Sequence, residues 1–183
     1  MTQEQIKAIA ERYRSGPHQP LHPSYRVFVQ ETLDQFRDLL AVGYRFVRSE
    51  SEPYATSRGM FEDMEKQRLL VYTGGQSFVE GHPLATRYRT WNQTKWGLQS
   101  INEVFRAVHD INGHGPTLAP FETFEGEMEA TRNHTRMYSQ DAWPALYGET
   151  VGQLCHYHAG LGYVKVQRAV VLSPGDIELC STL

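Results

Sequence analysis

Two histidines flank a short run of small and polar residues in the segment VHDINGHGP. His109 and His114 are five residues apart, so on a regular helix of about 100° per residue their side chains point about 140° apart. The two rings can therefore meet only if the helix ends or bends between them. Asn112 and Gly113 favour such an ending, because glycine adopts the backbone conformations that close a helix. We expect His109 and His114 to face each other.

A single acidic residue stands out in the helix expected from 142 to 160. Glu149 is the only Asp, Glu, Lys or Arg in that stretch. A lone buried carboxylate costs several kcal/mol, about the energy of several hydrogen bonds, unless it is paired or bound to a cation. Two histidines and one carboxylate are the ligand set of a facial triad, which leaves positions on a non-haem Fe(II) for O₂ and substrate. We predict that His109, His114 and Glu149 bind a metal ion.

Further polar side chains face inward on the same expected helices. Glu127 and His134 are seven residues apart and nearly eclipsed on the apolar side of a helix expected over 121–139. They either bind a second iron ion, orient water or substrate, or form a buried hydrogen-bonded pair and no more. The additional candidate ligands or orienting groups are Glu127, His134, Asp110, Gln153 and His156.

The two motifs together resemble a known family. FRAVHDINGHGP, followed by LYGETVGQ, is similar to the iron-binding core of the pterin-dependent aromatic amino-acid hydroxylases, over about Phe105 to Gln153. The resemblance implies Fe(II) held by His109, His114 and Glu149, and hydroxylation of a small aromatic substrate with O₂. It also implies a pterin cofactor, although no segment is identified as a pterin-binding loop. The strings GEMEA, HTRMY and ETVGQ also resemble uncharacterised bacterial and phage proteins, which carry no function with them.

Two other interpretations remain open at this point. VHDINGH also resembles the His-Asp signature of the HD-type phosphohydrolases, in which Asp110 would be a direct ligand and His82 and Asp141 would complete the site. The third interpretation is a binding protein in which the metal or a polar network is a structural clamp without open positions. Zinc and manganese are alternatives to iron as the metal of the site.

Periodicity and capping residues predict the elements that hold these side chains. Ser100 followed by Glu103 is a capping box, so a helix is expected to begin near Ile101. A strand is expected over 69–72 and a strand or strap over 163–172. The other helices are expected over 3–14, 25–42, 56–67, 121–139 and 142–160. The fold class is therefore mainly α with a few short strands, a single-domain helical bundle around the metal site.

Length and composition limit the classes of partner. A chain of 183 residues predicts one domain, with a helix and proline-rich connector over 1–24 and the metal-site helices over 98–160. The formal charge of −3 and the lack of a basic cluster argue against nucleic acid and anionic membranes, and favour a small-molecule substrate. Two cysteines, with no signal sequence recognised, predict a cytoplasmic protein.

Overall fold

Helices form most of the chain in the computed structural model, which describes residues 1–74, 77–87, 98 and 100–181. The predicted fold class, mainly α with short strands, is confirmed. The α-helices are α1 (Gln3–Ser15), α2 (Pro23–Ala41), α3 (Ser57–Met64), α4 (Ile101–His109), α5 (Phe124–Thr135), α6 (Trp143–Tyr147), α7 (Gln153–His156) and α8 (Pro174–Ser181). Three π-helical segments continue these helices. Asp110–His114 extends α4, Gly148–Gly152 joins α6 to α7, and Tyr157–Leu161 extends α7.

Capping residues define where the helices begin. Ser100 accepts a hydrogen bond from the Glu103 amide at the start of α4, as the sequence predicted. At α1, Thr2 and Gln5 form a reciprocal capping box. The helix predicted over 121–139 is shorter than expected, because Thr123 caps α5 and the helix ends at Thr135.

Two small parallel pairings connect segments that are far apart in the sequence. β1 (Arg45–Ser49) pairs with β2 (Arg68–Tyr72), and α3 is the crossover between them. β3 (Ser77–Phe78) pairs with β4 (Val166–Gln167) and so ties the middle of the chain to its last third. The strand expected over 69–72 is present as β2. The sequence did not predict β1 or α8.

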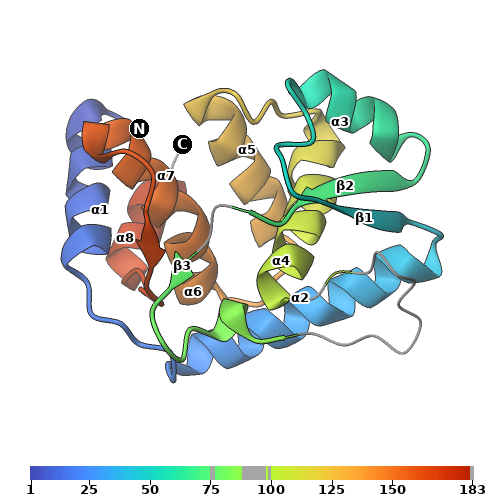
Figure 1. The fold of residues 1–183 in the computed structure, drawn as a ribbon. Coiled ribbons are helices and arrows are strands. Elements are labelled where there is room, and N and C mark those ends of the chain that lie inside the picture. Colours follow the sequence, from blue (N-terminus) through green and yellow to red (C-terminus); the bar gives the residue numbers. More distant parts are fainter. Residues whose placement is uncertain (75–76, 88–97, 99, 182–183) are drawn as a thin grey trace.

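The elements fall into two groups with α2 running along both (Figure 1). α1, α6, α7 and α8 lie at one end, and the β1–β2 pair with α3 lies at the other, with α4 and α5 between them. α2 contacts both α4 and α6. Buried clusters fill each part: Phe36, Leu69 and Val104 belong to one, and Ile9 and Val151 to another.

The cysteines and the helices of the described residues show two further features. Cys155 and Cys180 are both free and buried. Among the helices that the structure describes, none combines the length and the apolar character that crossing a bilayer requires.

Candidate metal centre

A π-helical turn brings the two motif histidines onto one face. α4 ends at His109, and the chain continues as the π-helical segment Asp110–His114, closed by a hydrogen bond from the Gly115 amide to the Asp110 carbonyl. In a π-helix the hydrogen bond spans five residues, so the residue at i+5 returns to the same side of the helix as residue i. The rings of His109 and His114 are 5.2 Å apart and almost perpendicular. The predicted meeting of the rings is confirmed, but a wider turn achieves it and the helix does not end at Gly113.

Helix α5 packs directly against this turn. A Cβ atom on Gly113 would lie 2.9 Å from the carbonyl oxygen of Ala130 and 3.1 Å from Nδ1 of His109, so only glycine allows the approach. The Asn133 side-chain amide donates a 2.9 Å hydrogen bond to the Gly113 carbonyl. The close contact carries Glu127, one turn into α5, toward the two histidines.

His109, His114 and Glu127 form a three-residue cluster suited to a metal ion. Their ligand atoms all lie within 4.8 Å of one another. In the described part of the chain, these three residues are the group of His, Cys, Asp or Glu side chains close enough together to share a metal ion. Oε2 of Glu127 is 3.9 Å from Nε2 of His109 and 3.7 Å from Nε2 of His114. Two ligands bonded to one ion at about 2.1 Å lie at most about 4.2 Å apart, so the two distances from Glu127 fit a shared ion. They are too long for hydrogen bonds.

The orientation of His114 is fixed by a backbone group. Its Nδ1 donates a 2.7 Å hydrogen bond to the carbonyl oxygen of Ala119. Burial, and then the neighbouring His109, lower the pKa of His114, so the ring is neutral near pH 7. The Nε2 lone pair of His114 therefore faces the Glu127 carboxylate, which is the arrangement of a histidine that binds a metal.

His134 is placed behind His109 and does not join the cluster. Its Nδ1 lies 2.9 Å from Nδ1 of His109, and its Nε2 lies 3.1 Å from Oε1 of Gln35. The ring is fully buried, and burial holds the pKa of His134 well below its usual range. The expected pairing of Glu127 with His134 is therefore corrected: Glu127 faces the two motif histidines, while both nitrogens of His134 are engaged elsewhere.

Glu149 lies in a separate buried network, so the predicted triad of His109, His114 and Glu149 does not assemble. Its carboxylate accepts hydrogen bonds from the Tyr25 hydroxyl and, at 3.0 Å, from Gln153, and its Oε1 lies 3.3 Å from Nε2 of His82. Burial and the nearby carboxylate raise the pKa of Tyr25, which keeps the phenol protonated as a donor. The sequence argument that Glu149 needs a partner holds, but polar side chains supply it.

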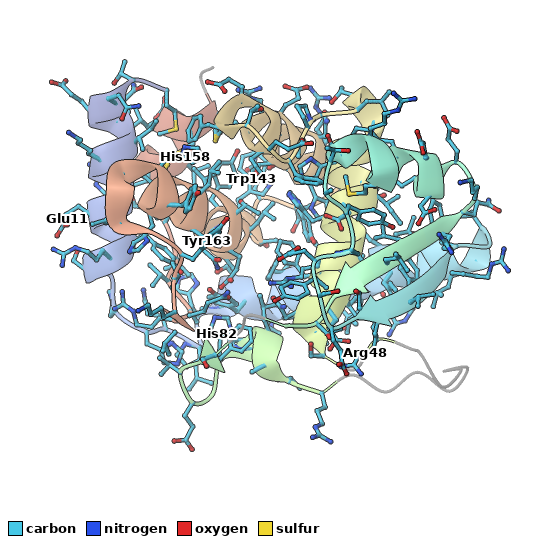
Figure 2. All side chains as sticks on the ribbon, turned by 45° about the horizontal axis from the view of Figure 1, so that its top comes forward. Glu11, Arg48, His82, Trp143, His158 and Tyr163 are labelled. Atoms are coloured by element: carbon cyan, nitrogen blue, oxygen red, sulfur yellow. The ribbon has the colours of Figure 1, made fainter. Side chains whose placement is uncertain are left out.

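Of the other candidate residues, His156 lies away from the cluster and Asp110 lies beside it. His156 bonds through Nδ1 to the Gly162 carbonyl at 3.0 Å and packs against the Tyr13 ring. Asp110 follows His109 directly and lines the cavity beside the cluster, where burial raises its pKa to about 7. The HD-type arrangement is not formed among the described residues, because His82 (labelled in Figure 2) is held beside Glu149 and Asp141 is exposed.

The cluster opens onto a cavity of about 500 Å³. Small-molecule sites have volumes of about 300–1,000 Å³. The Arg106 guanidinium donates a 2.8 Å hydrogen bond to the Tyr72 carbonyl and lies 5.3 Å from the centre of the Tyr72 ring. Tyr163, labelled in Figure 2, belongs to the exposed rim. The aromatic and sulfur-containing side chains of the wall are Tyr54, Met60, Tyr72, Phe121 and Tyr163.

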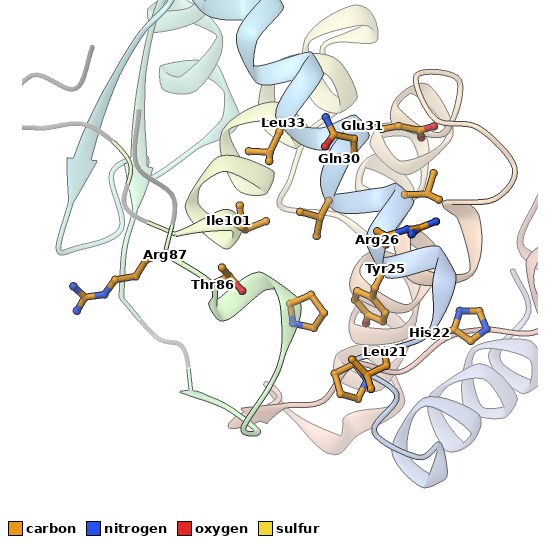
Figure 3. A pocket seen from close by; sticks show the side chains of 14 residues that line it. Leu21, His22, Tyr25, Arg26, Gln30, Glu31, Leu33, Thr86, Arg87 and Ile101 are labelled. Atoms are coloured by element: carbon orange, nitrogen blue, oxygen red, sulfur yellow. The ribbon is translucent and has the colours of Figure 1, made fainter. Parts of the chain in front are cut away.

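A second hollow of about 880 Å³ lies along α2 (Figure 3). Figure 3 shows Leu33 and Gln30 of α2 on the side that faces Ile101 and Thr86. Its lining is mostly apolar, and it includes no member of the three-residue cluster.

Comparison with known proteins finds no relative: no family model, no curated protein and no solved structure matches the chain. The function is therefore inferred from the geometry of the site.

Sequence reasoning missed Gln35, which contacts both His134 and Asn112. A signal was present in α2, where Gln35 interrupts the buried stripe of Phe28, Thr32 and Leu39. A polar side chain at a core position needs a partner, and that need marks the residue.

Proposed function

We propose that the chain is a mononuclear non-haem iron oxygenase, in which His109, His114 and Glu127 hold Fe(II) and a small aromatic substrate occupies the adjoining cavity. One observation carries the proposal. Oε2 of Glu127 lies 3.9 Å from Nε2 of His109 and 3.7 Å from Nε2 of His114, and the three side chains line a cavity. Two histidines and one carboxylate with open positions are the ligand set of non-haem Fe(II) oxygenases. Glu127 replaces Glu149 as the carboxylate that was expected from the sequence.

The arrangement of Glu127 and the two histidines is more favourable with a cation between them than without one. The side chain of Glu127 is 30% exposed, and its Oε2 faces the two rings at distances too long for hydrogen bonds. The neutral His114 ring points a lone pair at that oxygen, so the two groups repel unless a positive charge lies between them. The engagement of both His134 nitrogens favours one ion over two.

Bound Fe(II) would supply the activation of O₂ that an organic side chain cannot provide. The residues of the chain have the remaining tasks. His109, His114 and Glu127 would hold the ion, and the adjoining cavity would receive the substrate. Phe121 and Tyr54 provide apolar walls, which hold a planar substrate and exclude water from the reacting atoms. The proposal includes no pterin.

The experiment begins with anaerobic titration of Fe(II), followed by exposure to O₂ with ascorbate as the two-electron reductant and a panel of small aromatic compounds. We expect one iron per chain, and incorporation of ¹⁸O from ¹⁸O₂ into at least one compound, detected by mass spectrometry. Glu127→Ala should abolish both the iron binding and the incorporation of ¹⁸O. Glu149→Gln is the matched control and should bind iron as the wild type does.

Three results would overturn the proposal. The first is a protein that binds zinc tightly but not Fe(II), and the second is iron binding that survives Glu127→Ala. The third is loss of iron from Glu149→Gln while that variant remains folded, because this result would return the site to the triad expected from the sequence.

A further inference from the structure

A chain of hydrogen bonds runs from the backbone of Met137, just after the end of α5, to the back of His109, and its direction can be deduced from one end. Nε2 of Gln35 lies 3.2 Å from the carbonyl oxygen of Met137. A backbone carbonyl only accepts hydrogen bonds, so the NH₂ group of Gln35 must point toward it. The amide orientation is therefore fixed, and Oε1 of Gln35 faces the opposite way.

That oxygen determines where the proton of His134 lies. Oε1 of Gln35 is 3.1 Å from Nε2 of His134 and 2.9 Å from Nδ2 of Asn112. Because Oε1 is an acceptor, His134 must carry its proton on Nε2, and Asn112 donates to the same oxygen. His134 is fully buried with Gln35 and His109 at its two nitrogens, so its ring is neutral and its Nδ1 is an unprotonated acceptor.

The position of this proton on His134 determines the tautomer of His109 in the metal cluster. Two imidazole nitrogens at 2.9 Å share one proton, since two protons would clash and none would leave two lone pairs facing each other. With Nδ1 of His134 as acceptor, the proton belongs to Nδ1 of His109. The lone pair of His109 is then on Nε2, the atom that faces Glu127 at 3.9 Å.

We infer that Gln35 is a positioning residue, which acts through His134 to hold His109 in the tautomer that binds a metal through Nε2. The inference rests on the proposed metal site for its purpose, but the tautomers are a property of the protein without metal. His114 obtains the same tautomer directly from the Ala119 carbonyl. Both histidines are thus prepared before an ion arrives, one by a backbone group and the other by a relay.

The first test is made on metal-free wild-type protein. Long-range ¹H–¹⁵N NMR spectra of histidine-labelled protein distinguish the two neutral tautomers of each ring. We expect His109 and His114 with the proton on Nδ1, and His134 with the proton on Nε2. A proton on Nε2 of His109 would overturn the inference, whether or not the protein binds any metal.

The second test uses two substitutions at one position and Co(II) as the probe. Gln35→Leu removes the acceptor and frees His134 to turn its proton toward His109, so the dissociation constant for Co(II) should rise about 10- to 100-fold. Gln35→Glu retains an acceptor for Nε2 of His134, and should bind Co(II) within about threefold of the wild type. Both variants lose the bond to Met137, so their difference reports the acceptor together with the charge of the new carboxylate.

The outcomes separate the two claims. Equal Co(II) affinity for the wild type and a folded Gln35→Leu would overturn the relay while leaving the metal site in place. Absence of Co(II) binding in the wild type would contradict the proposed function, and the NMR spectra would still decide the tautomers. If Gln35→Leu fails to fold, the wild-type spectra alone decide the relay.

Discussion

Glu127 and Glu149 show how the same residue type serves different purposes at two places in the molecule. Glu149 is enclosed and its carboxylate is hydrogen-bonded, whereas Oε2 of Glu127 faces two imidazole nitrogens beyond hydrogen-bonding distance. A buried carboxylate with partners contributes to stability, since removing its charge leaves donors without an acceptor. A carboxylate without such partners contributes little to folding and is available for a ligand.

The two glutamates should therefore differ in their effect on stability. Without metal, Glu149→Gln should lower the free energy of unfolding by about 1–3 kcal/mol, because the substituted amide cannot accept from both Tyr25 and Gln153. Glu127→Gln should change it by less than about 0.5 kcal/mol. Urea denaturation followed by circular dichroism measures both values. A larger loss of free energy of unfolding for Glu127→Gln than for Glu149→Gln would contradict the roles given to the two glutamates.

The sequence contained the types of the site residues but not their grouping. His109 and His114 were identified from their spacing, and Glu127 from its inward position. Glu149 was assigned to the metal because a buried charge needs a partner, and that requirement does not specify which partner. His82 and Tyr25, which lie 67 and 124 residues away along the chain, became its neighbours only through the tertiary fold.

At the scale of elements, the site depends on the π-helical turn between α4 and α5. The capping residues and the apolar period predicted α4 correctly, because both signals are local. The π-helical turn has no such signal, because its composition resembles that of an α-helix or of a helix end. β1 also escaped prediction, since only Phe46 of its five residues is fully buried and the pattern does not alternate clearly.

Gly113 provides a direct test of this turn. Gly113→Ala places a methyl group 2.9 Å from the Ala130 carbonyl, so α5 must move away from the turn. We expect a loss of about 1–3 kcal/mol in the free energy of unfolding, with weaker metal binding, because Glu127 moves with α5. The variant is compared with the wild type by urea denaturation and by Co(II) titration.

Gly175→Ala is the matched control for that substitution. Gly175 lies in α8, and an added Cβ meets nothing within 4 Å. The free energy of unfolding of Gly175→Ala should be unchanged or higher by up to about 1 kcal/mol, because alanine reduces the conformational freedom of the unfolded chain. A Gly113→Ala variant as stable as this control would mean that α5 does not approach the turn as closely as described.

At the scale of the whole molecule, the two polar centres lie on different sets of elements. The cluster of His109, His114 and Glu127 belongs to α4, the π-helical turn and α5. The Glu149 network joins α2 to the helical run that begins with α6, close to the β3–β4 pairing. The long helix α2 contributes Gln35 to one centre and Tyr25 to the other, so it links a site for a ligand to a network that supports the fold.

The position of a bound ion tests the central claim most directly. Anomalous diffraction at the iron edge, from crystals grown or soaked anaerobically with Fe(II), locates the metal without reference to activity. The account predicts one anomalous peak between Nε2 of His109, Nε2 of His114 and the carboxylate of Glu127, beside the cavity of about 500 Å³. A peak at Glu149 and His82, or crystals soaked at millimolar Fe(II) with no peak at the cluster, would contradict it.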